Sequence, residues 1–314
     1  MEADLSQSLE HPALLRFLYY IARITPPHLA RLILHAASII RRVLGVVDKA
    51  EKQLVENLRI AFGDTYSRAE LKKIAQQCFY LRSIAVYDFY HYQHDLEGLR
   101  KNITVDEDLA ELLETFKKNH QPAIAISPHF VCTDIIGIEL AQHIHHLQVI
   151  SIANPGKSYQ LDNQVRENYG VEITPASMNA LRKAAKTLKN GDFVATGIDR
   201  AFPEEKIPNL FFGKPALLPT YYIRLALHCD VPILYFYGEV DRKGNYHMKG
   251  YNPITLKKYP TLEEEVIENS KTIIALTENV IREYPEQWSM FHPLWIDQFE
   301  EKRKKGKNDR TKNN

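Results

Sequence analysis

From Pro122 onward, short apolar runs rich in Val and Ile alternate with longer amphipathic segments. Strands that alternate with helices build βαβ units, and such units pair into a largely parallel sheet flanked by helices. The sequence therefore predicts an α/β core over residues 121–298. The expected strands are 123–127, 147–152, 171–174, 193–198 and 231–239, and the expected helices are 133–146, 159–169, 178–189, 220–228 and 263–283.

The chain before this core has the pattern of helices. Residues 49–92 and 106–119 read as helical, with Ser67 or Asp64 as a plausible N-cap. We therefore expect a helical portion over 49–120 that leads into the core. At the other end, residues 299–314 are basic and almost free of apolar side chains, so we expect a disordered tail.

The first 48 residues form an apolar segment that arginines interrupt. A membrane-spanning helix needs roughly 18 apolar residues with few charges, and no such run occurs here. Beyond Pro26 and Pro27, apolar residues recur at helical spacing, which predicts an amphipathic helix. It either packs on the protein's own core or lies in a bilayer surface with its arginines at the phosphates. The arginines are Arg16, Arg23, Arg31, Arg41 and Arg42.

Composition excludes several classes of protein. The 314 residues include 40 Lys+Arg against 39 Asp+Glu, so a globally basic nucleic-acid binder is excluded. Three widely spaced cysteines indicate neither a disulfide framework nor a zinc module, and they favour a reducing compartment. We interpret Cys132 as a packed thiol. We interpret His143, His145 and His146 as a surface cluster, and we expect no metal site.

One pair of residues at the end of the first core strand suggests catalysis. His129 follows that strand, and Asp134 lies five positions later at the start of the next helix. An acid that holds one imidazole nitrogen makes the other a general base for a hydroxyl nucleophile. The same spacing recurs at His292 and Asp297, but there Pro293 disfavours an immediate helical turn. A histidine that only caps the helix is the alternative for His129.

The His129-x4-Asp134 motif in this setting resembles the glycerolipid-type acyltransferases. The whole chain is more closely similar to the bacterial lipid A biosynthesis acyltransferases, the lauroyl and myristoyl transferases. Further stretches match in order between residues 14 and 296: VENLRIAFGDTYSRAELKKIAQQCF, NQVRENYG, GDFVATGIDRAF with NLFFGKPALLPT, and REYPEQWSMFHPLW. The chain departs from the family where it has Asp134 for the usual Glu, GIDR for Pro-Asp-Gln, and HPLW for an Arg-rich ending.

The resemblance implies a role for each matched residue. His129 would act as general base and Asp134 would orient it, with direct attack on a thioester, no acyl-enzyme and no cofactor. Backbone amides at the start of the next helix would stabilise the oxyanion. The substrate-binding residues would be Arg166 for a phosphate, Asp199 and Arg200 at a ligand crevice, and Phe211, Phe212 and Gly213 for an acyl chain. A solvated Arg166 and a core-packing Phe211 and Phe212 are the alternatives.

The resemblance also implies partners. The donor would be a thioester of acyl carrier protein or coenzyme A, and the acceptor a saccharolipid such as a lipid A precursor. The place of action would be the cytoplasmic face of the inner membrane. Two alternatives stay open: an acyltransferase for a lysophospholipid or another glycolipid, and a non-catalytic lipid-binding relative.

Overall fold

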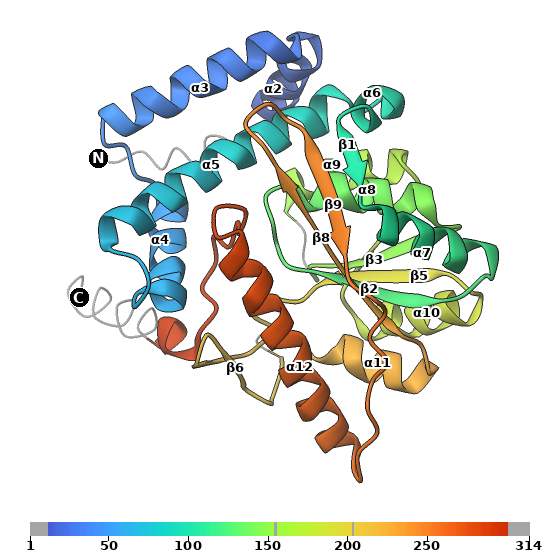
Figure 1. Cartoon of the computed structure of the whole chain (residues 1–314). Coiled ribbons are helices and arrows are strands. Elements are labelled where there is room, and N and C mark those ends of the chain that lie inside the picture. Colours follow the sequence, from blue (N-terminus) through green and yellow to red (C-terminus); the bar gives the residue numbers. More distant parts are fainter. Residues whose placement is uncertain (1–11, 154–155, 203, 301–314) are drawn as a thin grey trace, which may run out of the picture.

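The computed structural model describes residues 12–153, 156–202 and 204–300. Its centre is a seven-stranded sheet in the order β1-β9-β8-β2-β5-β3-β4 (Figure 1). Only β8 and β9 are antiparallel neighbours, so the predicted largely parallel α/β sheet is confirmed. The strands expected from sequence are β2 Ala123–Ser127, β3 Leu147–Ser151, β4 Val171–Pro175, β5 Phe193–Gly197 and β8 Ile233–Val240.

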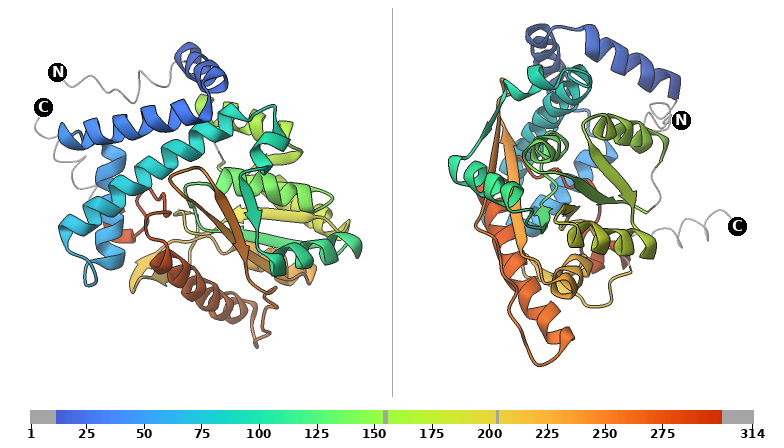
Figure 2. Two further views of the ribbon diagram at one scale, coloured as in Figure 1. Left: turned by 45° about the horizontal axis from the view of Figure 1, so that its top comes forward. Right: turned by 90° about the vertical axis from the view of Figure 1, so that its right-hand side faces the viewer.

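The two central strands β2 and β5 place their carboxyl ends side by side. Every residue of β2 is buried, as expected for a parallel strand that is covered on both faces. The register sets Ser127 opposite Gly197. The helices α8 Thr133–His143, α9 Lys157–Asn168, α10 Met178–Lys189, α11 Tyr221–Cys229 and α12 Leu262–Glu283 lie against the sheet and its edges (Figure 2).

Four short strands were not expected from sequence. β1 Ile103–Val105 lies inside the portion that we expected to be helical, and it pairs with β9 Tyr246–Gly250 at the sheet edge. A small hairpin also forms from β6 Asn209–Phe211 and β7 Lys214–Ala216. The three-residue strands β1, β6 and β7 carry too few alternations of polar and apolar residues to be recognised. The five residues of β9, YHMKG, contain no run of apolar residues. The expected helix at 106–119 is present as α7 Glu107–Lys118.

The N-terminal helices form a layer beside the sheet. Ser67 caps α5 through a capping box with Glu70, and Pro27 begins α3 where its missing N–H costs nothing. The predicted tail lies outside the described residues beyond residue 300. No helix in the described ranges is both long and apolar enough to span a membrane. The helices of this layer are α2 Pro12–Ile24, α3 Pro27–Val43, α4 Lys49–Phe62, α5 Arg68–His91 and α6 Leu96–Arg100.

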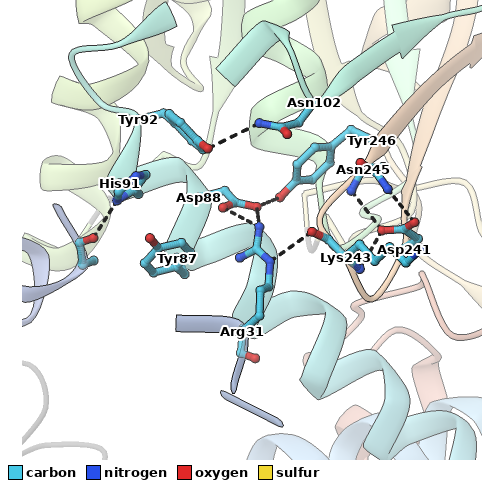
Figure 3. A network of polar contacts seen from close by, with 12 residues as sticks. Arg31, Tyr87, Asp88, His91, Tyr92, Asn102, Asp241, Lys243, Asn245 and Tyr246 are labelled. Carbon is cyan, nitrogen blue, oxygen red and sulfur yellow. Dashed lines mark hydrogen bonds and ion pairs between the residues drawn. The ribbon is translucent and has the colours of Figure 1, made fainter. Parts of the chain in front are cut away.

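A buried ion pair attaches α3 to the rest of the molecule (Figure 3). Nη2 of Arg31 lies 2.7 and 2.6 Å from the two carboxylate oxygens of Asp88 on α5. The hydroxyl of Tyr246 on β9 donates to the same carboxylate at 2.5 Å. Nε of Arg31 donates to the carbonyl oxygen of Lys243 at 3.2 Å. Burial raises the pKa of Asp88, even though the Arg31 charge opposes this shift.

We expect Asp88→Asn to lower the free energy of unfolding by about 3 kcal/mol, because it leaves the Arg31 cation buried without its counter-charge. Urea unfolding measures the change. The control is Lys271→Ala, which removes an exposed ion pair with Glu268 and should cost less than about 1 kcal/mol. An Asp88→Asn chain as stable as the control would show that this pair does not hold α3 in place.

Candidate active site

The candidate site lies where β2 and β5 end. His129 is two residues beyond the end of β2, and Asp199 is two residues beyond the end of β5. Because these strands are parallel neighbours, both residues leave the same edge of the sheet. The carboxyl edge of a parallel sheet is where α/β proteins bind ligands. The local topology therefore brings this histidine and this acid together.

The carboxylate of Asp199 holds the ring of His129. Its Oδ1 lies 2.5 Å from Nδ1 of the ring, and it also accepts the backbone N–H of His129 at 3.0 Å. Its other oxygen accepts the indole N–H of Trp288 at 2.7 Å. An ionised carboxylate only accepts hydrogen bonds, so a neutral imidazole paired with it has its proton on Nδ1 and its lone pair on Nε2. Asp199 is fully buried, whereas the His129 side chain is 36% exposed.

The segment around Trp288 fixes the loop that carries His129. The backbone N–H of Val131 donates to the carbonyl of Gln287 at 2.8 Å. The N–H and the hydroxyl of Ser289 both donate to the carbonyl of His129 at 2.9 Å. Trp288 itself is fully buried. A C-terminal segment thus holds both the acid and the backbone of the histidine.

The ring of His129 rests against the backbone of Gly197. A Cβ added at Gly197 would lie 2.4 Å from Cε1 of the ring and 2.9 Å from Nε2, distances that real side chains do not adopt. Glycine at this position is therefore required by the close approach of the imidazole. With Asp199 on one side and this backbone on the other, the ring has little freedom to turn.

Asp134 does not orient His129, contrary to the sequence-based expectation. Oδ1 of Asp134 accepts from Nε and Nη2 of Arg166 at 3.0 and 2.8 Å, and Arg82 lies 3.8 Å from its other oxygen. Burial alone would raise the pKa of Asp134, but the two arginine charges outweigh it and lower the pKa. Two charge-assisted hydrogen bonds from one guanidinium thus hold this carboxylate oxygen.

The guanidinium of Arg166 is occupied within the protein. Besides Asp134 it donates to the side-chain oxygen of Asn163 at 2.5 Å, and its Cζ lies 4.8 Å from the centroid of the Tyr159 ring. The expected contact with a phosphate is thus replaced by an internal pair that joins α9 to α8. Arg200 is half-buried, and its charge acts on the hydroxyl of Tyr159.

Within the loop at Phe211, Phe212 and Gly213, Phe211 belongs to the core, Phe212 is half-buried and Gly213 is exposed. Phe211 is fully buried and its ring lies 6.1 Å from those of Trp288 and Trp295. Gly213 supplies the left-handed turn of the β6–β7 hairpin, with φ of 72°. The expected contact with an acyl chain gives way to support for Trp288 and, through it, for Asp199.

The start of α8 offers fewer free amides than the sequence suggested. The N–H of Phe130 donates to the Thr133 hydroxyl at 3.0 Å, that of Val131 to Gln287, and that of Thr133 to the Phe130 carbonyl at 3.1 Å. These three amides are therefore engaged inside the loop and do not face an oxyanion. Burial raises the pKa of the Cys132 thiol, in keeping with a packed cysteine.

An apolar cavity of about 600 Å³ opens near the loop that carries His129. Its walls come from α2, α3, α5 and the start of α8, so it reaches Val131 and Asp134 close to the site. Polar groups gather at this end, where Arg82 and Asp162 join Asp134. Apolar side chains line most of the remainder: Ile21, Ala22, Ala30, Ile33, Leu34, Ala85, Val86, Phe89 and Ile135.

The described residues contain no group of three or more His, Cys, Asp or Glu arranged to hold a metal ion. The three clustered histidines have separate partners. His143 contacts Glu139 at 2.8 Å, His146 contacts Glu172 at 3.1 Å, and His145 contacts the Lys117 carbonyl at 3.0 Å.

Comparison with known protein families identifies the family of this chain. The model of the bacterial lipid A biosynthesis acyltransferases matches residues 7–297, nearly the whole chain. The chain belongs to this family. No curated protein matches the sequence significantly. The sequence-based recognition of the family is therefore confirmed.

Sequence reasoning missed three residues of this acyltransferase site. Trp288 and Gly197 lie inside the stretches that match the family, but no role was predicted for them. A glycine at the end of a strand, close to an acid, often marks a place where another group approaches the backbone closely. No local sequence pattern marked Arg82 as a functional residue. This arginine lies in the middle of α5, donates to the carbonyl of Val131 at 3.1 Å, and lines the cavity.

We expect Gly197→Ala to lower the rate of acyl transfer by about 10²-fold while the chain stays folded, because the new methyl group displaces the imidazole from its position. Transfer kinetics and the thermal unfolding midpoint measure the two effects. Gly137→Ala is the matched control, since a Cβ there meets nothing within 4 Å. Full activity of Gly197→Ala would mean that the ring position is not critical.

Proposed function

We propose that this chain transfers a fatty acyl group from a thioester to a hydroxyl of a lipid A-like saccharolipid, with His129 as general base. The observation that carries the proposal is the 2.5 Å contact between Nδ1 of His129 and the buried Asp199. It leaves Nε2 as a base in a partly exposed position. Membership of a family of lipid A acyltransferases supports both the reaction and the class of acceptor.

The reaction follows from this arrangement in two steps. Nε2 of His129 accepts the proton of the acceptor hydroxyl while its oxygen attacks the thioester carbonyl, and Asp199 stabilises the imidazolium that forms. The tetrahedral intermediate then collapses. The carbon–sulfur bond breaks, and the imidazolium returns its proton to the leaving thiolate. The products are an ester and a thiol, so no cofactor takes part and the enzyme regains its starting state.

The cavity near the loop that carries His129 supplies a place for the acyl chain. Its volume and apolar lining suit a fatty chain, and its polar end lies at Arg82 and Asp134, next to the histidine. A chain inserted from this end would leave its thioester beside Nε2. The helices α2 and α3, which wall the cavity, come from the segment that the sequence marks as amphipathic.

The outer side of these two helices supports attachment to a membrane. Leu32 and Ile40 on α3 are 64% and 57% exposed, and Phe17 and Tyr20 on α2 are 58% and 60% exposed. An apolar helix face of this kind gains free energy when it enters the boundary between headgroups and acyl chains. We propose that the chain lies on the cytoplasmic face of the inner membrane, where thioester donors and a lipid acceptor meet.

Acyl transfer to a purified lipid A precursor, followed by mass spectrometry, tests the reaction. We expect His129→Ala and Asp199→Asn to lower the rate by at least about 10²-fold, because each removes part of the base. Asp134→Asn should retain more activity than Asp199→Asn, because Asp134 contacts Arg166 rather than the ring. His145→Ala, far from the site, is the control.

Equal product from wild type and His129→Ala would contradict the reaction and favour a lipid-binding relative. A competing lysophospholipid in the same assay distinguishes the acceptors. Preferential acylation of the lysophospholipid would retain the chemistry and overturn the choice of acceptor.

Vesicle sedimentation tests the membrane surface. We expect Leu32→Glu with Ile40→Glu to lower partition into phosphatidylglycerol vesicles at least about tenfold, because two carboxylates would have to enter the apolar boundary. The matched control is Leu210→Glu with Leu262→Glu, since these leucines are 65% and 54% exposed but lie on β6 and α12. A similar loss in both variants would exclude a specific role for α3.

A further inference from the structure

A second recess lies between α4 and the start of α5, and we name it the α4–α5 groove. Its volume is about 650 Å³. Apolar side chains from both helices form part of its surface, with Val47 at one end and Tyr66 at the other. Charged side chains complete its lining: Glu51, Lys52, Glu56, Arg59, Arg68 and Lys72. None of these residues takes part in the site around His129.

The charges of the groove are predominantly positive once internal pairs are taken into account. Glu51 accepts from Arg41 at 2.7 Å, and Glu56 accepts from Arg59 at 2.6 Å, so both acids are neutralised. The remaining cations Lys52, Arg68 and Lys72 are exposed, and they have no carboxylate partner among residues that the structure describes. The groove therefore presents unneutralised positive charge beside apolar surface.

The spacing of these cations indicates the shape of their partner. Lys52 stands near the start of α4, while Arg68 and Lys72 are four residues apart on α5, about 6 Å along the helix at 1.5 Å per residue. A single phosphate needs donors that converge on one point, whereas separated cations match carboxylates spread over a protein surface. This distribution favours an acidic protein over a nucleotide or one lipid headgroup.

The groove and the apolar cavity open along the same face of α5. Arg68, Lys72, Phe79, Arg82 and Val86 recur every three, four or seven residues, so they share one face of this helix. The first two line the groove, and the last two line the cavity. Lys72 and Arg82 are about 15 Å apart along the helix axis. A protein seated in the groove would thus stand within reach of a flexible arm from the mouth of the cavity.

We propose that the α4–α5 groove docks an acidic carrier protein that delivers the acyl thioester on a flexible arm. This inference rests on the proposed acyl transfer, and it concerns the surface on which a carrier that bears the thioester docks. The carboxylates of the carrier lie on Lys52, Arg68 and Lys72, while its apolar side chains contact the half-buried Val55 and Tyr66 in the groove.

Binding of a fluorescent holo acyl carrier protein tests the surface without requiring any transfer. The groove variant combines Lys52→Glu, Arg68→Glu and Lys72→Glu. We expect its dissociation constant for the carrier to rise at least about tenfold at low salt, and added salt to weaken wild-type binding. A variant that keeps the charges, with Lys52→Arg, Arg68→Lys and Lys72→Arg, should bind as wild type does.

The control variant combines Lys118→Glu, Lys186→Glu and Lys189→Glu, exposed positions on α7 and α10 with the same change in charge. Its binding should stay within about twofold of wild type, and thermal midpoints verify that all variants fold. Equal carrier binding by the groove variant and wild type overturns the proposal, as does an equal loss in the control.

Vesicles of phosphatidylglycerol separate a lipid occupant from the carrier. A groove variant that loses vesicle binding but keeps carrier binding assigns the groove to lipid and overturns the proposal. A wild-type chain that binds the carrier through the groove but transfers no acyl group supports the docking surface while contradicting the proposed reaction.

Discussion

Asp199 is a fully buried carboxylate that accepts hydrogen bonds from the ring and backbone of His129 and from the indole of Trp288. A buried carboxylate without partners costs several kcal/mol, so the loop after β2 and the segment around Trp288 have to be in place together. The ring of Phe211 packs against Trp288 and helps to hold the indole in contact with Asp199. The position of the imidazole thus depends on three distant parts of the chain that one acid joins.

The parallel sheet and His129 were predictable because Val- and Ile-rich strands alternate with amphipathic helices, and because a histidine follows the first strand. The acid that contacts His129 could not be predicted from the sequence. Asp134 is near in sequence, whereas Asp199 is near only because β5 pairs with β2, and a strand order does not follow from local patterns. Arg82 is equally hidden, since a mid-helix arginine has no local signature. Asp199 and Arg82 come close to the loop that carries His129 only through the tertiary fold.

The helices α2 and α3 carry apolar residues on two sides, which explains why their sequence allowed two interpretations. Ala30 and Leu34 face the cavity, and Leu32 and Ile40 face outward. The ion pair between Arg31 and Asp88 fixes which side of α3 faces the protein. Packing on the protein's own core and contact with a bilayer are therefore compatible properties of the same helix.

The long separation of Asp199 and Trp288, 89 residues along the chain, has a consequence for biosynthesis. A growing chain emerges with its N-terminal end first, so the indole reaches the acid only when nearly all of the described residues have been made. By then α2 and α3 have long been exposed outside the ribosome. The helices whose outer face we propose for the bilayer are thus synthesised long before Trp288 completes the contacts of Asp199.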